Sequence, residues 1–397
     1  MKNYIDNSNL KINNTFDSLT RNLFLVGSIL LFVSGILFFL DKHHFFFSYL
    51  TSFTFFLTLT LGSMFIVLLH YLTSSGWNVL VRRVPELFMN NIYLMLILFV
   101  PILFGLHDLY HWTHIEDVLK DHILQIKRPY LNEFFFIVRM IFYFAVWIFI
   151  TKRFFNSSVE QDHSGSHAIT LKLQRSSTYS MILFALTLTF AGIDLVMSLT
   201  PHWYSTIFGV YIFAGAVLVA YCCTSLMYIF LRKRGFLNKI ITVEHFHDLG
   251  KLIYGFNIFW SYISFCQFFL IWYGNIPEET VFYAKHFVGS WSGVTYFLII
   301  GHFLIPFIFF MSRLFKRNLS YHAFMVSWLV FMHFVDLFWI IIPNSLKTGF
   351  SIQAIDITLF FGIASIYVGF VFFNMKKFSL IPSKDPRLSE SLSFENF

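Results

Sequence analysis

Five residues inside apolar stretches of the sequence could hold or transfer a proton: Asp194, Asp336, His302, His333 and Arg139. A carboxylate inside a membrane helix costs about 2.5 to 3.5 kcal/mol even on the lenient insertion scale, so it needs a partner, a proton or a function. Histidine and aspartate are the usual components of a proton path, because both can exchange protons in a suitable environment. These residue types therefore predict protonation chemistry within a membrane.

The spacing of these residues suggests how they are grouped. Within their apolar segments, Arg139, Asp194 and Asp336 all fall in the third nearest the membrane face that is predicted below to be the outer one. A paired guanidinium is much less costly to bury than a lone one, so we expect Arg139 to pair with Asp194. That pair is either a structural lock within one helix bundle or part of a proton route, and the sequence leaves both alternatives open.

The histidines allow two interpretations. His333 lies three residues before Asp336, so the two share a helical face, and His302 lies four residues before the helix-distorting Pro306. They extend the proton path from Asp336 in one interpretation. In the other, His70 and either His302 or His333 ligate a b-type haem, which requires two histidines that face each other.

The elements that position these residues are membrane helices. Hydrophobic residues make up 57% of the 397 residues and charged residues 12%, with a mean hydropathy of +0.67. This composition excludes a soluble enzyme and predicts an all-α integral membrane protein. Its ten apolar segments lie near residues 21–40, 50–71, 88–106, 134–151, 180–199, 206–231, 252–273, 291–312, 323–342 and 353–373.

The distribution of positive charge predicts the orientation. Of the 28 Lys and Arg residues, 21 lie in the amino-terminal tail and after the even-numbered segments, against 6 in the other connections. By the positive-inside rule both termini are cytoplasmic. These connections also account for the net charge of +7, so no nucleic acid is needed to explain it. We expect solvated cytoplasmic segments at residues 1–20 and 376–397, on either side of a transmembrane domain at 21–375.

An internal repeat relates the two acids. A hydrophobic residue, Asp and Leu occur at 193–195 and again at 335–337, and in both copies a proline follows the aspartate by seven residues. The copies lie in the fifth and ninth segments, an even number of segments apart, so they have the same orientation. We expect two parallel four-helix bundles at about 50–199 and 206–342, with peripheral helices at 21–40 and 353–373.

The connection at residues 107–132 is rich in histidine and acids. His107, His111 and His114 recur at helical spacing, so one face could bind a divalent metal. The alternative is an amphipathic surface helix that docks a partner or lies on headgroups, with Tyr110 and Trp112 at the interface. We expect no metal here.

One longer stretch resembles a known family. At residues 194–209, DLVMSLTPHWYSTIFG, the sequence resembles the membrane subunits of alternative complex III, a bacterial quinol:cytochrome c (or quinol:electron acceptor) oxidoreductase. It is most similar to the second quinone-binding-type subunit, of the NrfD-like superfamily of polysulfide reductase membrane subunits. Leu195 and Thr200 depart from the family pattern, so roles attached to those two positions do not transfer.

The resemblance implies a fold, a location and a set of partners. The family fold is a pair of four-helix bundles with flanking helices in the bacterial inner membrane. Its members hold no cofactor of their own. Their partners are a homologous quinol-binding membrane subunit, peripheral subunits with iron–sulfur clusters and multiple c-type haems, and a terminal oxidase. The resemblance implies a subunit that is not catalytic alone, that supports quinol oxidation and that conducts protons.

A quinol or menaquinol in this chain would need a group that accepts its hydroxyl proton. The candidates for that group are Asp194 and His202, at the outer end of the fifth apolar segment. Two other classes of function remain open. A secondary transporter also combines parallel repeats with charges in the membrane, although here the acids lie outward of the midplane. A purely structural anchor would use the ten helices only to hold peripheral redox subunits.

Overall fold

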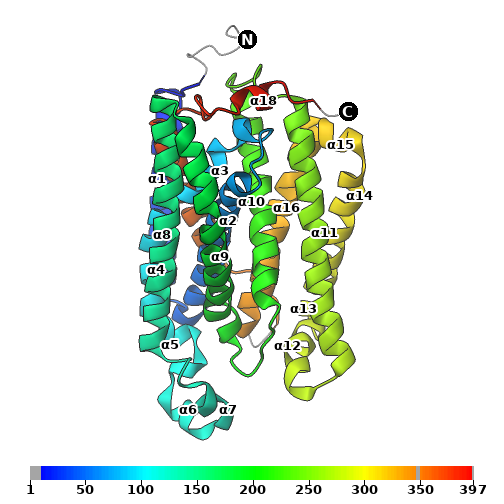
Figure 1. The fold of residues 1–397 in the computed structure, drawn as a ribbon. Coiled ribbons are helices and arrows are strands. Elements are labelled where there is room, and N and C mark those ends of the chain that lie inside the picture. Colours follow the sequence, from blue (N-terminus) through cyan, green and yellow to red (C-terminus); the bar gives the residue numbers. More distant parts are fainter. Residues whose placement is uncertain (1–9, 346–348, 396–397) are drawn as a thin grey trace.

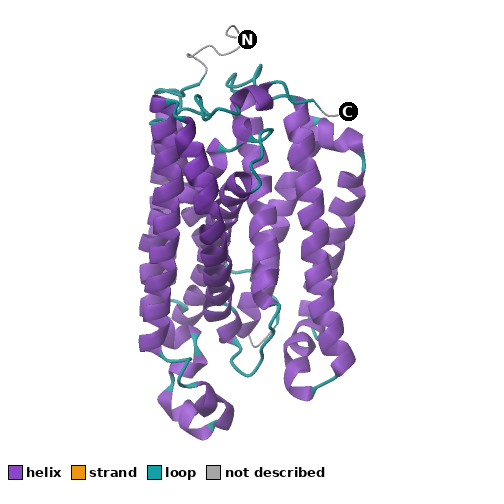
Figure 2. Ribbon diagram, in the orientation of Figure 1, coloured by secondary structure: helices purple, strands orange, loops and turns teal. Residues whose placement is uncertain are grey.

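The computed structural model describes residues 10–345 and 349–395, and every regular element in them is helical (Figure 2). Ten helical segments are long and apolar enough to cross a membrane, as the composition predicts. In a bilayer every backbone polar group must be satisfied internally, which is why long apolar segments fold as helices. Six segments are single helices: α1 (Asp17–Leu37), α2 (Lys42–Leu72), α8 (Glu133–Ser164), α10 (Phe208–Lys233), α11 (Val243–Gly274) and α17 (Ala354–Met375). Two contain one long helix and a short extension: His167–Leu199 with α9 (His167–Leu195), and Leu319–Asn344 with α16 (Leu319–Ile341). The last two are composite: Val79–Phe104 contains α3 (Arg83–Asn90) and α4 (Ile92–Phe104), and Trp291–Met311 contains α13 (Trp291–Leu298), the π-helical turn η5 (Ile299–Leu304) and α14 (Ile305–Met311).

Shorter helices gather at the two ends of this array (Figure 1). The lower end in Figure 1, here called the loop end, carries α5 (Leu106–Leu109), α6 (Ile115–Lys120), α7 (His122–Lys127) and α12 (Pro277–Phe287). The opposite end, the terminal end, carries α15 (Arg313–Arg317) and α18 (Leu388–Leu392). Both described ends of the chain meet at the terminal end, where the Leu380 N–H donates to the Leu10 carbonyl at 2.8 Å.

Eight of the ten segments can be described as two groups that also contact each other. In the first, α2 packs against α3, α4 and α9, and α8 packs against α4 and α9. In the second, α10 packs against α11 and α16, and α11 and α16 both contact the segment of α13, η5 and α14. Helices α1 and α17 pack on each other at the side, with α17 against α2. The two parallel four-helix bundles expected from the sequence stay a prediction.

The two groups meet along α2 and α10, where the backbones approach closely. A Cβ on Gly62 would lie 2.0 Å from the Ala216 carbonyl oxygen and 2.9 Å from the Cβ of Ala220. Only glycine fits opposite this pair of small residues, a usual device of helix packing in membranes. The close approach makes α2 the central helix of the molecule, so its polar side chains contact both groups.

The carboxyl-terminal segment is packed against the protein, contrary to the expected solvated tail. Arg82 is buried at the terminal end and donates from Nη2 to Asp385 at 2.6 Å. The backbone N–H of Ser383 donates to Asp162 at 2.8 Å. The lead-in also packs, since Ile12 and Phe16 are buried, while residues 1–9 lie outside the described part. An unpaired Arg82 would be costly to bury at the helix ends. Its ion pair with Asp385 therefore holds the carboxyl-terminal segment against the protein.

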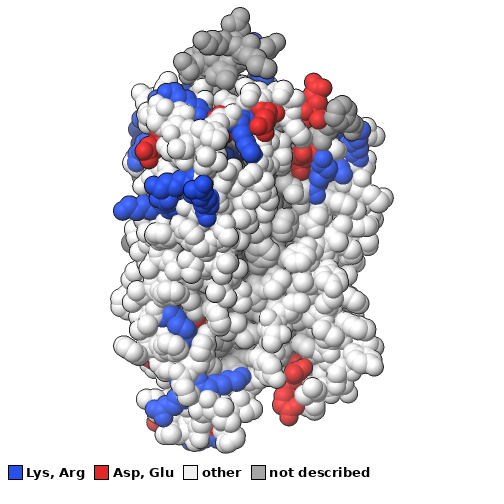
Figure 3. All heavy atoms as spheres, viewed as in Figure 1, with Lys and Arg blue, Asp and Glu red and all other residues white. Residues whose placement is uncertain are grey.

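The charge distribution on the surface agrees with membrane insertion. Lys and Arg side chains gather near the two ends of the face seen in Figure 3, and the middle is almost free of charge. Large exposed side chains in the long helices are apolar, for example Phe32, Ile141 and Phe265. An apolar band between two polar ends is what a bilayer requires.

Candidate functional site

Asp194 lies in a fully compensated ion pair near the loop end. Both carboxylate oxygens accept hydrogen bonds from Arg139: Nε to Oδ2 at 2.8 Å and Nη2 to Oδ1 at 3.0 Å. The Tyr143 hydroxyl adds a third donor at 2.9 Å. Asp194 is fully buried, and the pairing with Arg139 is the one that the sequence predicts. A bidentate guanidinium–carboxylate pair is a strong, oriented interaction, which α8 and α9 form by packing side by side.

The guanidinium of Arg139 is held in place on its remaining sides. Its Nη1 donates to the Tyr130 carbonyl at 2.8 Å, and its Cζ lies 3.9 Å from the Tyr130 ring centroid and 4.5 Å from that of Phe135. Aromatic faces attract a guanidinium, most strongly when it is desolvated. The pair therefore joins α8, α9 and the segment before α8 into one unit.

Asp336, the counterpart of Asp194 in the repeat, has different partners. The Tyr211 hydroxyl donates to Oδ1, and Trp260 Nε1 donates to Oδ2 at 3.3 Å. Asp336 is buried, and no Lys or Arg of the described residues forms an ion pair with it. One repeat acid is thus neutralised by a cation, and the other has only neutral donors.

His302 and His333 lie beside Asp336. Ligand atoms of the three residues lie within 4.8 Å of one another, and all three residues are buried. His333 Nε2 is 3.0 Å from the Thr58 hydroxyl of α2, and its Nδ1 has no hydrogen-bond partner among the described residues. Neither ring nitrogen of His302 has one, and its ring stacks on Trp260 with centroids 3.7 Å apart. Buried polar atoms are rarely left unsatisfied, so this cluster has unused capacity to hold a proton or a water.

Two backbone features make room for the histidines. His302 lies in η5, four residues before Pro306. Proline cannot donate a backbone hydrogen bond. Such π-helical turns often occur at functional sites. On α10, a Cβ on Gly215 would lie 2.9 Å from Cε1 of His333, so glycine leaves space for that ring.

A large apolar cavity opens onto this cluster. It has a volume of about 580 Å³, and Asp336, Tyr211 and Trp260 are among its lining residues. The outer lining includes Tyr262 and Phe265, which are 61% and 60% exposed on α11. The cavity therefore runs from the apolar side of the molecule to a buried carboxyl group. Apolar cavities with a few convergent polar groups are typical ligand sites.

The structure contradicts the interpretation in which His70 and either His302 or His333 ligate a b-type haem. His70 lies twelve residues after Thr58 on α2, about 18 Å along the helix at 1.5 Å per residue. Thr58 touches His333, and His302 lies beside His333. His70 therefore cannot share an iron with either residue.

His202 pairs with Asp121 and not with Asp194. Its Nε2 is 2.5 Å from Asp121 Oδ2, and both side chains are partly exposed at the loop end. The hydrogen bond from His202 lowers the pKa of Asp121 below its usual value. A cavity of about 250 Å³ beside this end is lined by Tyr130, Pro201 and Trp203 among others, and neither Asp194 nor His202 is part of its lining.

The histidines of residues 107–117 do not lie on one helical face as expected. The chain leaves the helix at Tyr110, between α5 and the 3₁₀ turn η3 (His111–Thr113). Tyr110 and Trp112, expected at a lipid interface, are buried. The Tyr110 hydroxyl donates to the Leu195 carbonyl at 3.0 Å. This segment is thus anchored to the end of α9.

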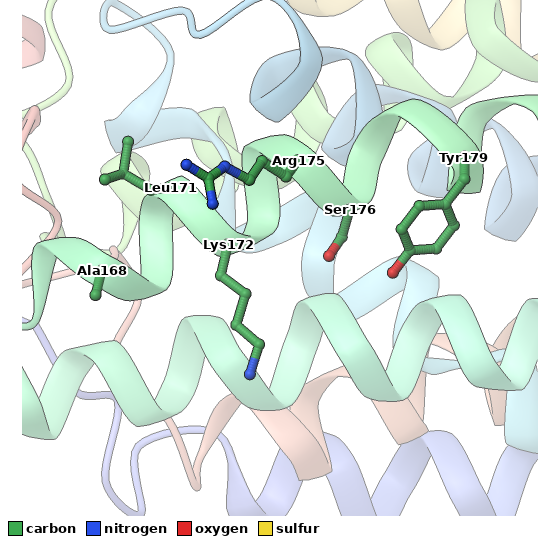
Figure 4. Close-up of a pocket in the computed structure, with 6 residues that line it drawn as sticks. All are labelled: Ala168, Leu171, Lys172, Arg175, Ser176 and Tyr179. Atoms are coloured by element: carbon green, nitrogen blue, oxygen red, sulfur yellow. The ribbon is translucent and has the colours of Figure 1, made fainter.

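A further hollow lies on one face of α9 near the terminal end (Figure 4). It has a volume of about 430 Å³ and is lined by Ala168, Leu171, Lys172, Arg175, Ser176 and Tyr179. All six come from one helix and none belongs to the Asp336 cluster. A groove formed by a single helix encloses no ligand, so it provides no argument for chemistry.

The sequence did not single out Tyr211, Trp260 and Thr58, which complete the Asp336 cluster. Aromatic and hydroxyl residues are common throughout these helices, and their role becomes visible only when α2, α10, α11 and α16 are packed. The sequence offered one signal, a polar Asn257 inside the apolar segment 252–273 and one helical turn before Trp260. In the described structure Asn257 is fully buried and its side chain makes no hydrogen bond.

Fold and site together define an all-α protein with ten helices suited to crossing a membrane and a buried acid beside an apolar cavity. The chain matches no protein-family model, and a search of curated proteins finds no significant relative.

Proposed function

We propose that this chain is an integral membrane subunit of a bacterial quinol-oxidising respiratory complex and that it binds a quinol in the 580 Å³ cavity. The observation that carries this proposal is the position of Asp336 at the inner end of that cavity. Its carboxyl group is buried and has no cation among the described residues. The resemblance of residues 194–209 to alternative complex III points to the same class.

The proposed chemistry uses the contrast between the two acids. Quinol oxidation releases two protons with two electrons, so a bound quinol needs a nearby base. Asp194 is held by a bidentate guanidinium, whereas Asp336 has an adjacent cluster of histidines with unused nitrogens. We therefore assign proton acceptance to Asp336, with His333 and His302 as the next carriers. Electrons leave through cofactors of partner subunits.

Arg139 and Asp194, predicted as members of the proton path, are assigned here to a structural role. By the positive-inside rule the loop end faces outward, so protons from Asp336 have a short route to the outside. By the same rule we expect the terminal end to face the cytoplasm. The bacterial inner membrane is the proposed location, as the resemblance implies.

The quinol site is tested by filling the cavity. Ser264 lines the cavity on α11, and Ser264→Phe places a ring there. We expect labelling by a photoreactive quinone, mapped by mass spectrometry, on cavity residues of α11 and α13 and a loss of at least about tenfold in labelling in this variant. The matched control is Ser327→Phe on the exposed face of α16, which should label as the wild type does.

Labelling that is unaffected by Ser264→Phe, or confined to other surfaces, would refute the site.

Purification in mild detergent tests the class of protein separately. A subunit of a redox complex should copurify with haem-coloured partners, whereas a secondary transporter should come out alone. An anchor without a quinol site would bring the partners and show no label in the cavity.

A further inference from the structure

Contrary to the expectation from the sequence, we infer that the loop end carries a site for a divalent transition-metal ion, formed by His111, His114 and Asp117. One ligand atom from each residue lies within 4.8 Å of the others. The site is separate from the cavity and does not depend on the proposed quinol chemistry.

The distances fit a metal site better than a hydrogen-bonded pair. Asp117 Oδ2 lies 3.5 Å from His114 Nδ1 and 3.7 Å from His111 Nδ1. Hydrogen bonds between nitrogen and oxygen span about 2.7 to 3.2 Å. In a tetrahedral Zn²⁺ site with ligands about 2.0 to 2.2 Å from the ion, neighbouring ligand atoms lie roughly 3.3 to 3.6 Å apart. The His114–Asp117 separation thus falls within the edge lengths of such a site, and the His111–Asp117 separation exceeds them by about 0.1 Å.

The tautomer of His114 is set for ligation. Its Nε2 lies 2.9 Å from the His107 carbonyl oxygen, which can only accept. In the neutral ring Nε2 therefore carries the hydrogen, and the lone pair of Nδ1 faces Asp117. A ligating histidine usually donates its other N–H to a carbonyl or carboxylate in this way. The His107 ring also stacks on that of His114, with centroids 5.7 Å apart and planes inclined by 4°.

The framework under the site is rigid and the ligands are accessible. Trp112 and Thr113 of η3 are buried, and the Thr113 hydroxyl donates to the Tyr110 carbonyl at 2.7 Å. The side chains of His111, His114 and Asp117 are 65%, 41% and 48% exposed. An ion can therefore enter from water without opening the protein, and a fourth position is left for water or a partner's side chain.

The donor set selects the kind of ion. Two imidazole nitrogens and one carboxylate suit Zn²⁺, Ni²⁺ or Cu²⁺, whereas Mg²⁺ and Ca²⁺ prefer oxygen ligands. A bound ion would link η3 to α6 and so stiffen the outermost part of the loop end.

The test is a Zn²⁺ titration of the full-length protein in detergent, freed of its affinity tag and of metal, against a chromophoric chelator. We expect the wild type to bind one equivalent that His111→Ala and Asp117→Ala weaken about tenfold or more. The control His122→Ala removes an exposed histidine of α7 and should leave that equivalent unchanged.

Thermal unfolding without metal should be the same for all four proteins, because surface substitutions of this kind change stability by about 0.5 kcal/mol or less. Saturating Zn²⁺ should raise the unfolding temperature of the wild type and of His122→Ala only. The site is excluded if the wild type binds no more Zn²⁺ than His111→Ala and Asp117→Ala do, or if His122→Ala weakens binding as much as His111→Ala does.

Discussion

Asp336→Asn is expected to lower quinol oxidation by the intact complex about 10²-fold or more, the usual contribution of a general base. The amide still accepts one hydrogen bond from Tyr211 or Trp260, which both bond the carboxylate in the native protein, but it cannot take up a proton. The measurement is quinol:cytochrome c reductase activity per assembled complex, together with the yield of released protons.

The matched control is Asp194→Asn, the same change at the equivalent position of the other repeat copy. Asp194 is sealed by Arg139 and Tyr143, so this variant should lose thermal stability and retain turnover in the complexes that assemble. Normal turnover in Asp336→Asn, or loss of turnover confined to Asp194→Asn, would reverse the roles assigned to the two acids.

Tyr211→Phe removes a donor to Asp336 and should alter the pH profile of turnover without abolishing it.

Arg139→Met is expected to destabilise the protein by about 3 to 5 kcal/mol, because it leaves the Asp194 carboxylate buried without its cation. The lost interactions are the two hydrogen bonds to Asp194 and one to the Tyr130 carbonyl. The measurement is unfolding of the purified protein in detergent by heat and by denaturant, which should show a lower transition for this variant.

A double-mutant cycle separates the pair from the packing around it. Arg139→Met with Asp194→Leu removes both charges and should recover most of the lost stability, since a buried ion pair replaced by apolar residues is often nearly neutral. Arg128→Met, at an exposed arginine before α8, is the control and should change stability by about 0.5 kcal/mol or less. Additive effects of the two buried substitutions would contradict a direct pairing energy.

The ten helices could be predicted from the sequence because the constraint is local. A segment of about twenty apolar residues can satisfy its backbone in a bilayer only by closing its own hydrogen bonds. The pairing of Arg139 with Asp194 was predictable for a related reason: both charges lie at similar depth, and a lone charge there is costly.

Other features depend on side chains from helices far apart in the sequence. Asp194 and Asp336 share only the surrounding hydrophobic residue, Leu and Pro pattern. Among the described residues Asp194 alone of the two receives a cation, because Arg139 lies on α8, which packs against α9. The neighbours of Asp336 come from α10, α11 and η5, and the ordered carboxyl-terminal segment is held by charges at the terminal end. The apolar segments determined which parts of the chain are helices and, through matched depth, the pairing of Arg139 with Asp194. Only the packing of the helices decided which groups surround Asp336, because those contacts depend on the distance between helices and not on spacing along the chain.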